Sequence, residues 1–411
     1  MKGNMYVIQL GEGKLLRTLI DPIIYEIIED GWGGKIVVTN LTKNGEHNID
    51  ELKHHNGNYC IFLRNDKEIS KKEINITPLS LKKDWQKLNN YMETEHVPAI
   101  VSNSTEAGFV LDRSELNPSI SPNTYIGILC SLLFSKYKRN YKSSINVFPT
   151  ELLENNGILL HNMVLKQSKV WSLNNEFGIW LESHVKFINT WVDRIVTNVP
   201  LGNDYYKIEC NGMITSIGEK YGKWWIESSE YVLDDFPIYR TNEVELVNNI
   251  ENYYRMKVWV LNAAHLFIAC LGLIYGFKTV SEAYKENKIR KYVLSYWNEI
   301  RELIAIPINE VDNFIDNTDK RFKQEWLNHQ LKSIAVNVDI KWHTRIEPAM
   351  EEYKVKKGYY NDSGLIMTIF IGIYKSRTEN IEIENAIELL IGKESSLKDA
   401  VINEFRKSFN C

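Results

Sequence analysis

The first forty residues alternate between short apolar runs and an amphipathic stretch. Tyr6–Leu10 is an apolar run that predicts a buried strand, and Lys35–Thr39 predicts a second strand. Between them, apolar residues recur every three or four positions from Leu15 to Ile28, which predicts a helix that Pro22 interrupts. This order of elements, with a glycine turn after the first strand, is a βαβ unit whose crossover is expected to be right-handed.

The alternation continues, less regularly, through the first half of the chain. Further strands are predicted at Tyr59–Arg64, Pro98–Ser102, Ile145–Phe148 and Phe187–Val196, and helices at Tyr125–Tyr137 and from about Asn156. Strands that alternate with helices predict a mostly parallel, doubly wound sheet, so residues 1–245 are interpreted as a Rossmann-like α/β domain. Residues 200–240 are rich in Gly, Asp, Asn and Tyr, and they are interpreted as an irregular connecting region.

From about Val247 the pattern becomes almost entirely helical. Long helical patterns predict helices at Val247–Ile274, Val280–Ala305, Trp326–Val336, Leu365–Tyr374 and Ile381–Leu390. Residues 246–411 are therefore predicted to form a mostly α-helical domain. Val258–Phe277 is about as long as a bilayer span, but it contains Asn262 and His265 and has no second span to accompany it. We interpret it as a buried helix.

Composition narrows the class of protein. The chain has 411 residues, of which 44% are hydrophobic and 25% charged, a balance typical of a soluble globular protein with two domains. The net charge of -4 argues against broad binding to nucleic acids or anionic membranes. Five scattered cysteines without a CxxC pair predict reduced thiols in a cytoplasmic protein, with neither a disulfide framework nor a zinc site, and no signal peptide is expected.

Gly11 and Gly13 stand between the first predicted strand and the first predicted helix. Glycines at that place allow a tight turn and let backbone N–H groups approach a pyrophosphate. Leu16 replaces the third glycine of the usual fingerprint, so the context, more than the motif, favours a nucleotide site over a plain turn. The second strand ends in Thr39-Asn40, which is neither acidic nor basic, and local chemistry leaves both NAD and NADP open.

Three polar residues interrupt the apolar helix that opens the second half. At about 100° per residue, Lys257, Asn262 and His265 project into one half of the helix surface. Buried polar groups need partners, so this sector is expected to face a cavity, a ligand or itself. The other interpretation is an exposed lysine beside a core histidine.

The chemistry of these three side chains suits carbonyl reduction. Desolvation lowers the pKa of a lysine, so that Lys257 can transfer the alcohol proton. Asn262 can donate to the developing oxyanion, and His265 can orient the substrate or the lysine.

Several segments together resemble the polyol-specific long-chain dehydrogenases, the mannitol dehydrogenase family. The resemblance is carried by Gln9–Arg17, Ser104–Gly108 and the helix around Lys257, and a uronate-reducing branch is further matched by Pro149–Gly157, Asn189–Thr197 and Phe322–Lys341. The resemblance covers most of the chain in the same order. It implies a Rossmann domain, a helical C-terminal domain, an active site between them without a metal, and NAD as the cofactor.

The resemblance also assigns roles to residues. The family's catalytic motif falls on Lys257, Asn262 and His265, and substrate contacts are implied for Asp193 and Lys341. Cofactor contacts are implied for Gln9, Gly11, Glu12, Gly13, Thr105, Glu106 and Asp193.

Two departures from mannitol dehydrogenases bear on the substrate. Leu152 stands where those enzymes carry a second oxyanion asparagine, and Ser333 stands where they carry a substrate-contacting arginine. Both agree with the uronate branch, whose anionic substrate needs a cation such as Lys341 or, second, His265. The implied activity is the reversible, NAD-linked reduction of a keto sugar acid, tagaturonate to altronate, in hexuronate catabolism. Fructuronate or a polyol such as mannitol is the nearest alternative substrate, and a catalytically idle NAD-binding sensor or partner module is the alternative of another class.

Overall fold

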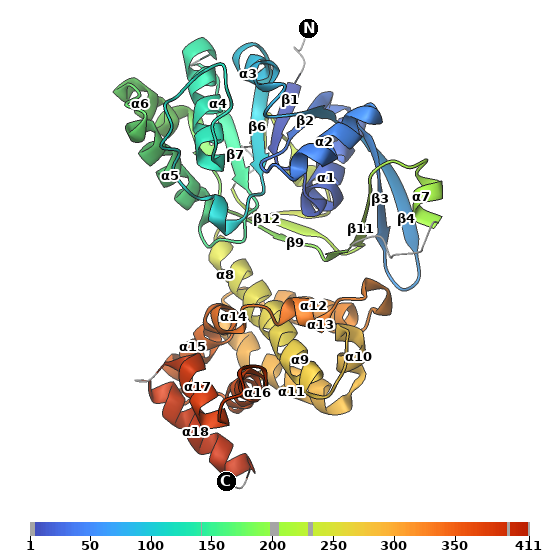
Figure 1. The fold of residues 1–411 in the computed structure, drawn as a ribbon, viewed down its shortest axis with the longest axis vertical. Coiled ribbons are helices and arrows are strands. Elements are labelled where there is room, and N and C mark those ends of the chain that lie inside the picture. Colours follow the sequence, from blue (N-terminus) through green and yellow to red (C-terminus); the bar gives the residue numbers. More distant parts are fainter. Residues whose placement is uncertain (1–4, 141, 198–204, 229–232, 393–394, 410–411) are drawn as a thin grey trace. The chain divides into compact units, whose positions relative to one another are not determined.

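The computed structural model describes residues 5–140, 142–197, 205–228, 233–392 and 395–409. The chain divides into two compact units, Met1–Glu251 and Asn252–Cys411 (Figure 1). The first unit is built around sheets and the second consists of helices. This confirms the predicted fold class, an α/β Rossmann-like half followed by a mostly helical half.

The main sheet of the first unit has six parallel strands in the order β5-β2-β1-β6-β7-β8. These strands are β1 (Met5–Leu10), β2 (Gly34–Thr39), β5 (Thr77–Leu79), β6 (His96–Ser102), β7 (Ile145–Pro149) and β8 (Val185–Phe187). The strands on both sides of β1 lie parallel to it, which is the doubly wound arrangement that the alternating pattern predicted.

Both faces of this sheet are buried. Along β1, Val7 belongs to one apolar cluster and Ile8 to another, because successive side chains of a strand point to opposite faces. The Val7 face is covered by α1 (Asp21–Ile27) and the π-helical turn η1 (Leu16–Ile20) that precedes it. The Ile8 face is covered by α3 (Trp85–Thr94), α4 (Tyr125–Asn140), α5 (Asn156–Val170) and α6 (Asn175–His184) (Figure 1). Burial on both faces explains why these strands read as continuous apolar runs.

Pro22 marks an irregularity in the first helix, as its position predicted. It lies in the first turn of α1, where a missing N–H costs little. Directly before it, the N–H of Asp21 donates to the carbonyl of Leu16, five residues back. The chain therefore accommodates the proline with one wider helical turn.

Two smaller sheets in the first unit overturn the interpretation of residues 200–240 as irregular. Within the described part of this region lie α7 (Tyr205–Glu209), β11 (Thr215–Glu219) and β12 (Lys223–Glu227). They contribute to one sheet in the order β10-β11-β3-β4 and another in the order β13-β12-β9. The other members are β3 (Asn58–Arg64), β4 (Ile69–Asn75), β9 (Thr190–Asp193), β10 (Val196–Thr197) and β13 (Val244–Val247). β11 and β12 are only five residues long, and glycines lie in or near them, which hid them in the sequence.

The second unit is organised around one apolar helix. This helix runs from Ile250 through α8 (Ile250–Arg255), the π-helical η6 (Met256–Asn262) and α9 (Ala263–Ile274). It is long and apolar enough to cross a membrane, but 83% of its most apolar stretch is buried inside the protein, as expected of a core helix. Packed against α9 are α10 (Val280–Lys285), α11 (Asn287–Ile300), α13 (Leu331–Ile334), α14 (Val338–Arg345) and α16 (Asp362–Glu379).

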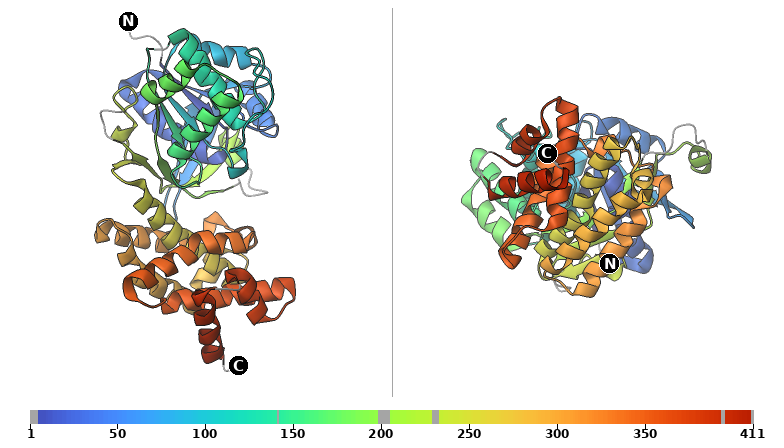
Figure 2. Two further views of the ribbon diagram at one scale, coloured as in Figure 1. Left: turned by 90° about the vertical axis from the view of Figure 1, so that its left-hand side faces the viewer. Right: turned by 90° about the horizontal axis from the view of Figure 1, so that it is seen from below.

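Some predicted helices of this unit differ from the observed ones. The predicted helix Val280–Ala305 is two helices, α10 and α11, because Glu286 caps the second one in an extended conformation. The predicted helix Trp326–Val336 contains only the turn η8 (Glu325–Leu327) and the short α13. The remaining helices are α12 (Ile308–Phe322), α15 (Glu347–Lys357), α17 (Ile383–Ile391) and α18 (Ser396–Phe409), the last of which is the dark red helix at the edge of the unit (Figure 2).

Candidate active site

The glycine turn has the geometry that its sequence predicted. Gly11 follows β1 with φ of 121°, and its N–H donates to the carbonyl of Thr39 at 2.8 Å. A Cβ on Gly11 would lie 3.0 Å from the carbonyl oxygen of Asn103, so only glycine fits there. A Cβ on Gly13 would meet no atom within 4 Å, and helical turns begin at the next residue. The backbone at Gly13 is therefore open to a ligand.

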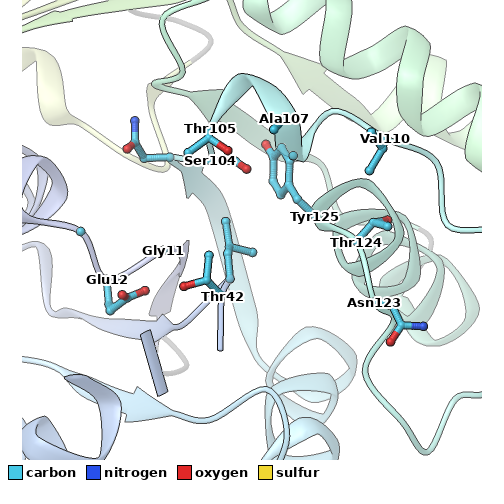
Figure 3. A pocket seen from close by; sticks show the side chains of 14 residues that line it. Gly11, Glu12, Thr42, Ser104, Thr105, Ala107, Val110, Asn123, Thr124 and Tyr125 are labelled. Atoms are coloured by element: carbon cyan, nitrogen blue, oxygen red, sulfur yellow. The ribbon is translucent and has the colours of Figure 1, made fainter. Parts of the chain in front are cut away.

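This turn forms one wall of a cavity of about 360 Å³ at the carboxyl ends of β1, β2 and β6. The lining residues come from the glycine turn, the loop after β2, the loop after β6 and the start of α4: Gly11, Glu12, Gly13, Leu41, Thr42, Asn103, Ser104, Thr105, Ala107, Gly108, Val110, Asn123, Thr124 and Tyr125. Figure 3 shows Glu12 and Thr42 along one side and Ser104 and Tyr125 along the other. Open parallel sheets bind nucleotides at such a place.

Gln9 and Arg17 support the turn from below. Gln9 is fully buried and its Nε2 donates to the carbonyl of Gly11 at 3.2 Å. Arg17 is buried as well and donates from Nη1 to the carbonyl of Glu12 at 2.7 Å. Gln9 therefore holds the turn and is not among the residues that line the cavity, and the cofactor contact expected for it stays a prediction.

The opposite wall rests on a buried carboxyl group. Glu151, which follows β7, accepts the N–H of Ser104 at 2.8 Å and the hydroxyl of Ser102 at 3.4 Å. The hydroxyls of Ser102 and Tyr125 lie 2.7 Å apart. Burial raises the pKa of Glu151. These contacts fix the loop that carries Thr105, and sequence reasoning missed them because only the fold brings Glu151 to that loop.

Asp193 and Glu106 are two further residues that were expected at the cofactor. Asp193 ends β9 and is buried, and it is not among the residues that line the cavity. Glu106 begins the short turn η3 (Glu106–Gly108), and its side chain lies outside the described part of the structure.

In the second unit, Lys257 and Asn262 lie at the two ends of a π-helical turn. The N–H of Ala263 donates to the carbonyl of Val258, five residues back, so η6 contains one residue more per turn than an α-helix. Residues i and i+5 of such a turn stand almost above one another, as i and i+4 do in an α-helix. Lys257 and Asn262 are consequently closer on the helix surface than a regular wheel suggests.

Most residues of the π-helical turn η6, Lys257 included, are buried. Lys257 is 8% exposed, and five apolar neighbours along η6 are buried with it. The indole N–H of Trp297 on α11 donates to the carbonyl of Val260 at 2.8 Å. Asn262 is half-buried at the end of the turn. A lysine and an amide are thus held at fixed places in a largely apolar setting.

His265 lies one turn further along, on α9, in a basic environment. It is 7% exposed, and its Nε2 has no hydrogen-bond partner among the described residues. The ring of His329 packs edge-on against it, with centroids 4.6 Å apart. Burial lowers the pKa of His265 well below its usual range, and the nearby His329, Arg345, Arg321 and Lys341 lower it further. His265 is therefore a neutral imidazole surrounded by basic groups.

Lys341 is the other lysine that the sequence singled out. It lies on α14, is half-buried, and donates from Nζ to the carbonyl of Ile334 at 2.7 Å. Burial lowers the pKa of Lys341, and the neighbouring Arg345 adds to this. Ser333 is exposed and donates to the carbonyl of Gln330, whereas Leu152 in the first unit is 51% exposed. The two positions that depart from mannitol dehydrogenases thus carry no charged group.

Comparison with known protein families decides the relationship. The mannitol dehydrogenase Rossmann domain matches residues 5–239, and the mannitol dehydrogenase C-terminal domain matches residues 249–389. The chain belongs to the mannitol dehydrogenase family. This confirms the resemblance that the sequence motifs indicated.

Two curated relatives of this family member are altronate oxidoreductases. The altronate oxidoreductase of Bacillus subtilis strain 168 is 29% identical over 372 residues, which are 86% of this chain and 76% of that protein. The altronate oxidoreductase of Halalkalibacterium halodurans is 28% identical over 366 residues, which are 86% of this chain and 71% of that protein.

Solved structures show the same fold at lower identity. Pseudomonas fluorescens mannitol 2-dehydrogenase, in a ternary complex with NAD and D-mannitol, matches with a TM-score of 0.75 at 17% identity, over 98% of this chain and 87% of that chain. A substrate-free D-sorbitol dehydrogenase matches with a TM-score of 0.78 at 14% identity, over 98% of this chain and 89% of that chain. At these identities the likeness concerns the fold alone.

Proposed function

We propose that this protein is an NAD-dependent oxidoreductase that reversibly reduces a keto sugar acid, tagaturonate to altronate, in the cytoplasm. The observation that carries the proposal is the π-helical turn that holds a buried Lys257 and Asn262 on one side of a helix. The relatives named altronate oxidoreductase support the choice of substrate. Residues 1–245 would serve the cofactor, and residues 246–411 would supply the acid–base chemistry.

The glycine-turn cavity fits a dinucleotide. The open side of Gly13 leaves room for a pyrophosphate against backbone N–H groups, and Gly11 and Thr105 lie on the walls of the same cavity. NAD, when bound, supplies the hydride acceptor of the alcohol and, when reduced, the hydride donor. The residues of the chain bind and orient it there.

Proton transfer is assigned to Lys257. Reduction of a carbonyl places negative charge on its oxygen, which must receive a proton. Lys257 as an ammonium holds that proton, and the amide N–H of Asn262 donates to the same oxygen and stabilises the developing charge. His265, neutral because it is buried, can orient the sugar through the Nε2 atom that has no partner among the described residues.

The charge of the second unit's site favours an anionic substrate. Besides burial, His329, Arg345, Arg321 and Lys341 lower the pKa of His265. Burial lowers the pKa of His329 itself, so the positive charge near the ring comes from Arg345, Arg321 and Lys341. Lys341 retains N–H donors beyond the one that contacts Ile334, because an ammonium has three. These cations attract a carboxylate, which gives an anionic substrate an advantage over a neutral polyol.

The test is NADH consumption, followed by absorbance, with tagaturonate, fructuronate, fructose and sorbose as oxidants. Tagaturonate is expected to give the highest kcat/KM. A higher kcat/KM for fructuronate or for a neutral ketose would reject the substrate. Binding of NADH without turnover of any compound would identify an idle cofactor-binding protein instead.

A further inference from the structure

The residue at the end of β2 does not explain how the protein would choose between NAD and NADP. In Rossmann folds the residue there reads the 2′ position of the adenosine ribose, with an acid for NAD and a basic residue for NADP. Here Asn40 occupies that place, but both ends of its amide are engaged. Its Nδ2 donates to the carbonyl of Thr42 at 3.0 Å, and its Oδ1 accepts the N–H of Leu81 at 3.2 Å. Asn40 is also buried, so it does not read a ribose.

A carboxylate reaches this end of the cavity from another element. Glu12, between the two glycines of the turn, lines the cavity together with Leu41 and Thr42 of the loop after β2 (Figure 3). Its Oε1 accepts a hydrogen bond from Nδ2 of Asn48 on α2 (Gly45–His54) at 3.3 Å. The side chain therefore spans from the glycine turn to the helix that follows β2.

The start of α2 is shaped to receive this carboxylate. A Cβ on Gly45 would lie 2.5 Å from Oε1 of Glu12 and 2.7 Å from Oε2. The carboxylate thus occupies the space that a side chain at Gly45 would fill. Gly45 itself is fixed, because its N–H donates to the hydroxyl of Thr42 at 3.1 Å. Gly45 is buried and fixed by Thr42, and the carboxylate of Glu12 packs against it. Together with the hydrogen bond from Asn48, this packing holds the carboxylate in one position.

We propose that Glu12 makes this protein selective for NAD over NADP. This inference rests on the proposed function, because it assigns the glycine-turn cavity to a nicotinamide dinucleotide. A carboxylate accepts hydrogen bonds from the two hydroxyls of an unmodified ribose. It repels the 2′-phosphate of NADP, and the fixed position of Glu12 prevents it from moving aside. The glycine turn then supplies the acidic group that other Rossmann folds place at the end of the second strand.

The experiment compares NADH and NADPH binding by fluorescence titration of the full chain at low ionic strength. Glu12→Gln keeps the shape and the bond with Asn48 but removes the charge. We expect wild type to bind NADH more tightly than NADPH, and Glu12→Gln to reduce this ratio at least about tenfold, mainly through tighter NADPH binding. Asp50→Asn is the matched control. Asp50 is an exposed residue on α2, the helix that carries Asn48, and its carboxylate does not line the cavity. This variant should leave the ratio unchanged.

Three results would overturn the inference in distinguishable ways. Equal affinity of wild type for the two dinucleotides would show that the carboxylate does not discriminate. A ratio in Glu12→Gln within twofold of wild type, or an equal change in Asp50→Asn, would assign discrimination to other groups. Failure of wild type to bind either dinucleotide would reject the proposed function itself.

Discussion

Lys257 and His265 are both almost fully buried, yet their surroundings differ. Burial and the surrounding basic groups keep the His265 ring neutral. Lys257 lies among apolar residues of η6 beside the amide of Asn262. In the proposed function, the neutral ring and the amide would orient a ketone, and the amine would supply one proton.

The first prediction concerns Lys257. Lys257→Ala should lose roughly 10²–10⁴ in kcat, the usual contribution of a general acid–base group. NADH binding should persist, because the glycine turn lies in the first unit. Steady-state turnover and NADH fluorescence titration on the same preparation check this. A near-normal kcat would remove the lysine from the mechanism, and loss of NADH binding as well would indicate a structural role.

The second prediction concerns the carboxylate of the substrate. Lys341→Met should raise KM for tagaturonate more than for a neutral ketose, because it removes one cation from the cluster around His265. Lys332→Met is the control, since Lys332 is an exposed lysine on the neighbouring helix α13. Equal changes in KM for charged and neutral substrates would contradict the role of Lys341.

The third prediction follows from Asp21, which is fully buried below the glycine turn. Tyr59 donates to its Oδ2 at 2.5 Å, while its Oδ1 has no partner among the described residues. Burial raises the pKa of Asp21 to about 7, against the opposing effects of Tyr59, Gln9 and Arg17. The folded protein therefore keeps a proton that the unfolded chain releases above about pH 4.

Stability from this group is thus fully present below about pH 4 and is lost as the pH rises to about 7, by roughly 4 kcal/mol. The difference in unfolding free energy between wild type and Asp21→Asn, measured by urea denaturation from pH 4 to 8, should change in that direction. A difference that is constant with pH would show that Asp21 is ionised in the folded protein.

At the scale of elements, the sequence predicted the strands and helices that show a clear pattern of apolar residues within their own length. The strands of the parallel sheet are apolar runs, and the helices that cover it have apolar residues at helical spacing. The sequence therefore predicted these elements and their order along the chain. The run Phe187–Val196 read as one strand, yet it divides among β8, β9 and β10 in three different sheets. Only tertiary partners decide that division. Trp326–Val336 is apolar at helical spacing, but it contains only the end of η8 and the short α13. In the loop between them, the carbonyl of His329 accepts the N–H of Val280.

The candidate site shows the same limit. Gly11, Gly13, Lys257, Asn262 and His265 were identifiable because their neighbours along the chain form motifs. The supporting roles of Glu151, His329 and Arg345 could not be predicted, since these residues reach the first-unit loop or His265 from distant elements. The basic surroundings of His265 became visible only after folding.

The fourth prediction tests the glycine turn as an element. Gly13→Val should weaken NADH binding at least about tenfold, because the side chain enters the cavity where a pyrophosphate meets the backbone. The fold should persist, since the new Cβ meets no atom within 4 Å. Gly178→Val on α6, where a Cβ also meets nothing, is the control for the effect of valine alone. Unchanged affinity in a folded Gly13→Val variant would make the turn purely structural.

For the whole molecule, the division into two compact units predicts how a ligand acts on stability. NADH at about 100 times its Kd should stabilise the part that binds it by roughly 2.7 kcal/mol, or about 5–10 °C in Tm for a unit of this size. Calorimetry of the full chain with and without NADH measures this. At the same NADH concentration Gly13→Val should lower the shift to about half or less, because tenfold weaker binding leaves roughly 1.4 kcal/mol. An equal shift in that variant would place the cofactor elsewhere.

The π-helical turn at η6 has a consequence for how this helix tolerates insertions and deletions. In a regular α-helix one extra residue rotates everything before it by about 100° relative to everything after it, whereas a π-helical turn takes up the extra residue within one wider turn. Loss of a single residue between Lys257 and Asn262 would restore an ordinary helix and leave its hydrogen bonds intact. Lys257 and Asn262 would then be four positions apart, where an α-helix also places two side chains almost above one another, so this turn can gain or lose one residue without turning the amine away from the amide.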